Sequence, residues 1–231
     1  MNNTLEKTKK SNVPVIVAGV VTSIAFVIMI FMGIKGIFDN VRNIYETIKY
    51  LDDYTFEIIM LRIPSILLSL AAILSTVILA VYCALTAIRK GKKVKSLYIA
   101  GFVIVMLVSV FSAFSTLFNL ISAMTQGWYP WHYTAAMIVS IVSSALTTLA
   151  FLLAAIAGFV KKPKASRIIG IVAVVLIVIC ALLVLVNNGL NLFYVKGFFN
   201  ILKIFVPTAL GQLVRIVAFA GTILLLRPVK E

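Results

Sequence analysis

The sequence predicts an all-α fold: a polytopic membrane bundle of six transmembrane helices with both chain ends in the cytoplasm. Of its 231 residues 62% are hydrophobic and 12% charged, and the mean hydropathy is +1.13. Soluble domains usually contain about 45–50% apolar residues. Six apolar stretches each reach roughly the 20 residues that cross a hydrocarbon core of about 30 Å, and basic residues cluster in alternate connectors. Because these stretches take up most of the chain, we expect no separate soluble domain.

Clusters of charged, Pro, Gly and aromatic residues interrupt the apolar runs and give the boundaries. A basic tail, residues 1–12, precedes a single transmembrane domain, residues 13–226, and a short tail, residues 227–231, follows it. Three lysines precede the first apolar run, as in a secretory signal, but the run is too long for such a signal and is interpreted as a retained helix. The predicted spans are 13–34, 63–88, 97–124, 134–160, 168–188 and 207–226.

The basic residues outside the spans predict the orientation. The two tails and the second and fourth connectors hold fourteen Lys and Arg residues, whereas the first, third and fifth connectors hold five. Cytoplasmic loops carry the excess of Lys and Arg, so both termini are predicted to be cytoplasmic. A net charge of +14 would indicate nucleic-acid binding in a soluble protein. Here the short basic clusters flank spans, so we expect anionic lipid headgroups of a plasma (cytoplasmic) membrane as partners and no nucleic acid.

The outer connectors suggest three two-helix hairpins. The segments GIFDNV from Gly36, TLFNLI from Thr116 and GFFNIL from Gly197 share a Phe followed by Asp or Asn, and each lies near the outer end of one hairpin. All three hairpins would point the same way, so a true repeat would be of the parallel kind. Chance similarity between apolar segments is an equally weighted alternative.

The outer connectors of the first and third hairpins have the composition of interfacial helices. The first holds five of the seven acidic residues, and apolar residues recur among them at three- and four-residue spacing, which is typical of an amphipathic helix on the outer membrane surface. An ordinary linker helix is favoured there over a binding role. The connector of the third hairpin, residues 189–207, is too apolar for a solvated loop, so we expect it to lie in the interface or re-enter the membrane. The apolar residues of the first connector are Phe38, Val41, Ile44, Tyr45, Ile48 and Leu51.

The predicted spans carry no catalytic, cofactor or metal signature, since they contain no Asp, Glu or His. The single His132 lies among Trp128, Tyr129, Trp131 and Tyr133 and is interpreted as part of an aromatic anchor at the headgroup level, rather than as a ligand-recognition residue. Two cysteines inside apolar segments lack CxxC spacing and are expected to be packing residues. We therefore expect no enzyme, cofactor or metal, and only lipid chemistry using loop residues stays open as a catalytic alternative.

Small and hydroxyl residues recur at helical spacing and predict packing between helices. In lipid, close approach through Gly, Ala, Ser and Thr holds bundles together. Packing is therefore favoured here over a polar conduction path. The residues concerned are Ser65 and Ser69 in the second span, Ser109, Ser112 and Ser115 in the third, and Ser140, Ser144, Thr148, Ala154 and Gly158 in the fourth.

Arg215 is the most informative polar residue within the spans, because a guanidinium in the bilayer costs several kcal/mol unless it snorkels, hydrates or pairs. One interpretation ties it to the acids of the first connector, which also lie nearest to Arg62 at the start of the second span. The other places it in an outward-opening cavity for an anionic or polar ligand, and the ion pair is favoured. The cavity would be lined by Arg215 and Gln212 together with Asn187, Asn188 and Asn191.

The functional prediction follows from this inventory. We expect a transport-related or accessory membrane subunit without catalytic activity. A membrane-embedded scaffold that binds a membrane protein partner is the alternative, and a lipid-modifying enzyme is less favoured.

Overall fold

The computed structural model describes residues 2–50, 55–89, 95–125, 131–192, 195 and 197–226; within its helices, the side chains of residues 2–13, 47, 48, 50, 55–62, 89, 119, 122 and 123 are not described. The described chain forms six α-helices and no strand, and every helix contains a segment long and apolar enough to cross a membrane. The helices are α1 (Asn2–Tyr50), α2 (Thr55–Arg89), α3 (Lys95–Thr125), α4 (Trp131–Phe159), α5 (Pro163–Asn191) and α6 (Phe198–Leu225).

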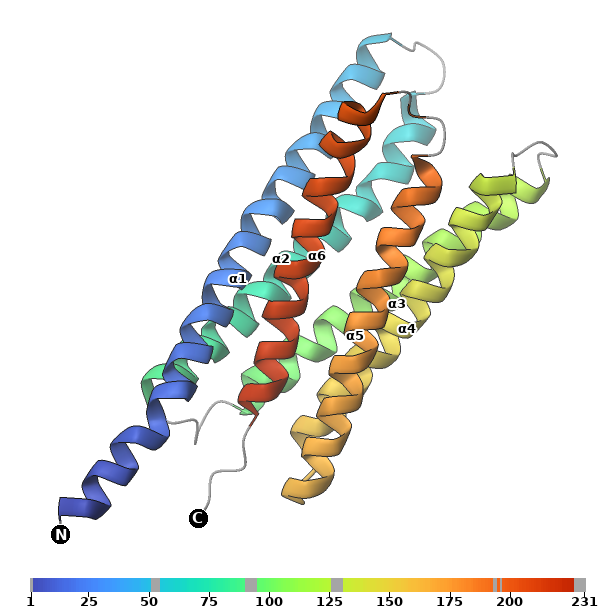
Figure 1. The fold of residues 1–231 in the computed structure, drawn as a ribbon. Helices are drawn as coiled ribbons and strands as arrows, with labels where there is room; N and C mark the ends of the chain where they lie inside the picture. Colours follow the sequence, from blue (N-terminus) through green and yellow to red (C-terminus); the bar gives the residue numbers. More distant parts are fainter. Residues whose placement is uncertain are drawn as a thin grey trace.

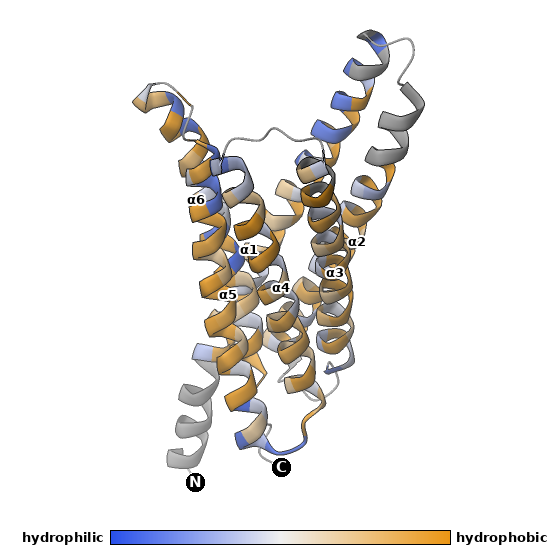
Figure 2. Cartoon of the chain, turned by 90° about the vertical axis from the view of Figure 1, so that its right-hand side faces the viewer, coloured by the Kyte–Doolittle hydropathy of each residue, from blue (hydrophilic) through white to orange (hydrophobic). Residues whose placement is uncertain are grey.

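The six helices form a closed ring in sequence order. Each helix packs against the next along the chain, and α6 returns to pack against α1, with a smaller contact to α2. Helix α1 begins and α6 ends at the same end of the bundle (Figure 1), which we call the terminal end. At the opposite, distal end the helices diverge (Figure 2). Each helix therefore has two main neighbours in the ring, one on either side.

The predicted spans 97–124, 134–160 and 168–188 agree with α3, α4 and α5 to within five residues at each end. Helices α1, α2 and α6 are longer than predicted, and α2 begins at Thr55, eight residues before the predicted start. Helix α1 continues past residue 34 to Tyr50, so the amphipathic segment is helical but extends α1 instead of forming a separate helix. Helix α6 begins at Phe198 and contains Pro207 inside it, so much of the apolar fifth connector is the first part of a spanning helix. The placement of either segment in a membrane interface is not confirmed.

Small residues bring neighbouring helices into close contact, as predicted for Ala154 and Gly158. Both are buried on α4, and a Cβ added at Gly158 would lie 2.9 Å from the Tyr98 ring. The Tyr98 hydroxyl donates a hydrogen bond to the Ala154 carbonyl over 2.9 Å. A backbone carbonyl of α4 is thus reached directly from α3, which is possible only because the facing residues are small.

Four phenylalanines fill the interior of the ring towards its terminal end. Phe26, Phe102, Phe151 and Phe219 come from α1, α3, α4 and α6, and each is at most 2% exposed. The Phe219 ring centroid lies 5.6 Å from that of Phe26, 6.1 Å from that of Phe102 and 4.8 Å from that of Phe151. These are typical contact distances for aromatic pairs. We call these four residues the aromatic floor.

Candidate functional site

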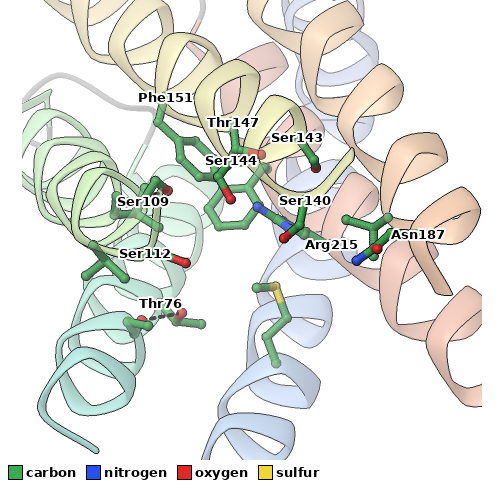
Figure 3. A pocket seen from close by; sticks show the side chains of 16 residues that line it. Thr76, Ser109, Ser112, Ser140, Ser143, Ser144, Thr147, Phe151, Asn187 and Arg215 are labelled. Atoms are coloured by element: carbon green, nitrogen blue, oxygen red, sulfur yellow. Dashed lines mark hydrogen bonds between the residues drawn. The ribbon is translucent and has the colours of Figure 1, made fainter. Parts of the chain in front are cut away.

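A cavity of about 380 Å³ lies inside the ring, on the distal side of the aromatic floor. All six helices contribute to its wall, and Phe151 and Phe219 close it towards the terminal end. Its volume lies within the range of about 300–1,000 Å³ that is usual for small-molecule sites. The polar side chains of its wall are Thr76, Ser109, Ser112, Ser140, Ser143, Ser144, Thr147, Asn187 and Arg215, and Figure 3 shows them grouped around a common space.

Among the described residues, Arg215 is the only charged one in the wall of this cavity. It lies seventeen residues after Phe198 and ten before Leu225, which places it roughly 25 Å from one end of α6 and 15 Å from the other. The guanidinium carbon lies 5.9 Å from the centroid of the Phe151 ring, within the range of a cation–π contact. The cation is therefore held deep within the bundle, immediately above the aromatic floor.

The predicted ion pair between Arg215 and an acid of the first connector is absent from the described part of the chain. Glu46 pairs instead with Arg42 over 2.8 Å on the exposed surface of α1. The described part of the cavity wall contains no carboxylate. The acids Asp52 and Asp53, and the side chains of Glu57 and Arg62, lie outside the described residues.

Four of the hydroxyl residues that were predicted to pack between helices line the cavity instead. They are Ser109 and Ser112 of α3 and Ser140 and Ser144 of α4. Ser109 donates to the Val105 carbonyl of its own helix. Among the described residues, the hydroxyls of Ser112, Ser140, Ser144 and Thr147 form no hydrogen bond. These four hydroxyls can therefore donate to a bound molecule.

The predicted asparagine and glutamine residues are only partly brought together with Arg215. Asn187 lines the cavity, and its buried Oδ1 atom has no hydrogen-bond partner in the described structure. Gln212 lies almost one helical turn before Arg215, and neither it nor Asn188 belongs to the wall, although each has one buried polar atom without a described partner. Asn191 is exposed at the end of α5. Of the six predicted polar residues, the cavity therefore contains Arg215 and Asn187.

A second cavity continues from the first towards the distal end, between α2 and α3. Its volume is about 620 Å³, and it shares Ala72, Val108 and Ser112 with the first. Leu67 and Phe111, which also line it, are each 60% exposed on the outer surface of the bundle. We call it the α2–α3 groove; it adjoins the central cavity at the three shared residues and reaches exposed residues on the surface of the bundle.

The described residues contain no group of three or more His, Cys, Asp or Glu side chains that could hold a metal ion. His132 is buried at the start of α4 with its ring against Trp131, while Trp128 and Tyr129 of the predicted aromatic anchor lie outside the described residues. Both cysteines are buried, and the Cys83 sulfur lies 3.3 Å from the Thr222 hydroxyl.

The fold and the cavity define a class of protein more clearly than a particular activity. Six helices long and apolar enough to cross a membrane, arranged around a polar interior, are features of a multi-pass membrane protein. No family model, no curated protein and no solved structure matches the chain. The function is therefore inferred from the cavity itself.

Proposed function

We propose that this protein binds a small anionic solute in the central cavity, as a transport-related membrane subunit without catalytic activity. One observation carries the proposal: a guanidinium lies in a cavity lined by all six helices, and no carboxylate belongs to the wall. An arginine at the centre of a membrane helix costs about 2.5–3.5 kcal/mol on insertion scales. An anionic ligand would offset that cost, and the four unpaired hydroxyls would add neutral donors beside the charge.

A binding role is preferred to a catalytic one because of what the wall contains. The lining residues include hydroxyls, an amide and a guanidinium but no carboxylate, imidazole or thiol. Acid–base and nucleophilic catalysis use a base near the nucleophile, and the wall supplies none. Hydrogen-bond donors around a single cation serve recognition instead.

The aromatic floor supports a role in transport with access from one side at a time. The floor separates the cavity from the terminal end, whereas the α2–α3 groove leads towards the distal end. With N and C termini in the cytoplasm, as the basic connectors predict, the cavity would open to the outer side of a plasma membrane. Passage to the cytoplasm would then require the four rings to separate. As part of the same proposal, the six helices would form three parallel two-helix hairpins, and the outer connectors of the first and third hairpins would lie in the membrane interface.

Substitution of Arg215 tests the proposal. For a bound anion we expect Arg215→Leu to weaken binding about ten- to hundredfold, since a hydrogen bond to a charged group contributes about 1.5–3 kcal/mol. Without ligand the same variant should unfold at an equal or higher temperature, because it removes an uncompensated cation from the bundle. Thermal unfolding in detergent, with and without a panel of small carboxylates and inorganic anions, measures both effects.

The matched control is Arg42→Leu, which removes an exposed arginine outside the cavity. It should leave every ligand response unchanged. A structural ion pair would give the opposite pattern, in which Arg215→Leu lowers the stability of the free protein. If no anion of the panel stabilises the wild-type protein, the binding proposal is wrong.

A partner-binding role is the second candidate, and an apolar groove on α1 and α2 favours it. The groove has a volume of about 400 Å³ and lies on the surface of the bundle, where a helix of another membrane protein could pack. Crosslinking in native membranes followed by mass spectrometry tests this role. Recovery of self-contacts alone would argue against it. The groove residues are Val20, Ser23, Ile24, Val27, Ile28, Phe31, Ala84, Ala87 and Ile88.

A further inference from the structure

We infer that the ligand of the central cavity is a single-chain amphiphilic anion, with its head at Arg215 and its hydrocarbon tail in the α2–α3 groove. This inference rests on the proposed function and adds the chemical class of the ligand. A fatty acid carboxylate is the simplest molecule of this class. It would enter from the outer leaflet between α2 and α3.

The two adjoining cavities differ in charge in the way that such a molecule requires. The central cavity contains the guanidinium, the unpartnered Asn187 oxygen and four hydroxyls without a described partner. Among the described side chains, the wall of the groove contains none that is charged, and Leu67, Leu68, Val108 and Phe111 contribute to it. The polar end of the combined space is therefore the deep end, and the apolar end is the one nearest the surface.

Two hydroxyls of the groove are satisfied within their own helices. Ser69 donates to the Ser65 carbonyl over 2.8 Å, and Thr116 donates to the Ser112 carbonyl over 2.9 Å. A hydroxyl that already donates to a backbone carbonyl does not need a hydrogen-bond acceptor from a neighbouring molecule. These two positions therefore accommodate an alkyl chain, while the other three hydroxyls of the groove, on Ser65, Ser112 and Ser115, form no hydrogen bond within the described residues.

The groove also lies where a membrane-dissolved molecule could reach it. Leu67 and Phe111 line the groove and are both 60% exposed, on two adjacent helices of the bundle surface. The neighbouring segments of α2 and α3 belong to the membrane-spanning candidates. A side entrance between them would open to lipid, and a ligand that uses it would arrive already dissolved in the bilayer.

The test compares carboxylates that share one headgroup and differ in chain length. The purified protein in nanodiscs is titrated with acetate, hexanoate and decanoate, and the concentration for half-maximal thermal stabilisation is measured. Each methylene that moves from water to an apolar site is worth about 0.8 kcal/mol, or roughly fourfold in affinity. We expect decanoate to act at a concentration at least a hundredfold below that of acetate, and Arg215→Leu to raise both concentrations about ten- to hundredfold.

Leu67→Trp and Leu70→Trp form a matched pair of variants. Both positions are exposed on α2, but only Leu67 lines the groove. Leu67→Trp should remove most of the preference for decanoate and preserve the response to acetate, whereas Leu70→Trp should change neither. If Leu70→Trp has the same effect as Leu67→Trp, the preference comes from the lipid surface and the inference is wrong.

A tail-labelled photoreactive fatty acid provides an independent readout. We expect crosslinks at residues 64–72 and 108–116, and their loss in Arg215→Leu. Labels spread over the whole bundle surface and unchanged in that variant would overturn the inference. An Arg215-dependent response to acetate without chain-length preference would also overturn it, yet would leave the proposed function intact. An absent response to all three carboxylates and to the wider anion panel would overturn both.

Discussion

Removal of the Phe219 ring should open the aromatic floor. Phe219 is 2% exposed and contacts the other three rings of the floor. Phe219→Ala therefore removes the ring against which the other three pack. The deleted phenyl ring frees roughly 100 Å³, enough for about three waters at about 30 Å³ each. The substitution should cost about 3 kcal/mol, at the lower end of the range for buried Phe→Ala changes, because lipid already solvates apolar groups well.

Cys83 offers a native reporter for this opening. Its side chain is fully buried beside Thr222, one turn beyond Phe219 towards the terminal end. In a Cys180→Ala background, a water-soluble maleimide should react with Cys83 at least tenfold faster in Phe219→Ala than in the protein with an intact floor. The reaction is followed by intact-protein mass spectrometry well below the unfolding temperature.

Phe114→Ala is the matched control for that measurement. Phe114 is 65% exposed on α3 and belongs neither to the floor nor to the central cavity, so its removal should leave Cys83 unreactive. A folded Phe219→Ala variant in which Cys83 stays protected would refute the idea that the floor closes the cavity. The idea would also be refuted if Cys83 reacted as fast in the protein with an intact floor as in Phe219→Ala.

Two further predictions concern the packing of the bundle and its lipid contacts. Tyr98→Phe removes the hydrogen bond to Ala154 and should lower the free energy of unfolding by about 1–2 kcal/mol, measured by denaturation in mixed micelles, because the buried carbonyl loses its interhelical donor. Lys164→Ala combined with Arg167→Ala should reduce the stabilisation by phosphatidylglycerol relative to phosphatidylcholine nanodiscs, since both cations line a cavity of about 560 Å³ between α5 and α6. Lys203→Ala, which lies outside that cavity, should not reduce it.

The number of spanning helices could be predicted from the sequence because it depends on a property of single segments. A run of about 20 apolar residues has one low-energy arrangement in a bilayer, an internally hydrogen-bonded helix. The ends of such runs were harder to place. Helices α1 and α6 continue through residues 35–50 and 198–206, where scattered polar residues lower the hydropathy without breaking the backbone hydrogen bonds of a helix.

The cavity could be predicted only in part, since it depends on how each helix is rotated about its axis. The three-residue spacing of Ser109 and Ser112 showed that both lie on one face of the same helix. It could not show whether that face meets another helix or an open space. Gln212 and Arg215 are three residues apart and lie on similar faces, yet only Arg215 reaches the cavity. The aromatic floor has no local signal, because the buried Phe219 and the exposed Phe114 occur in equally apolar stretches of sequence.

The closure of the ring by α6 has a consequence for how the protein is made. Helices leave the ribosome in order, so the first five must enter the membrane before the one that packs between α5 and α1. Until then the interior is an incomplete shell with hydroxyls on its inner side. The last helix brings Arg215 and Phe219 together, so a single docking event supplies both the charge of the site and part of its closure.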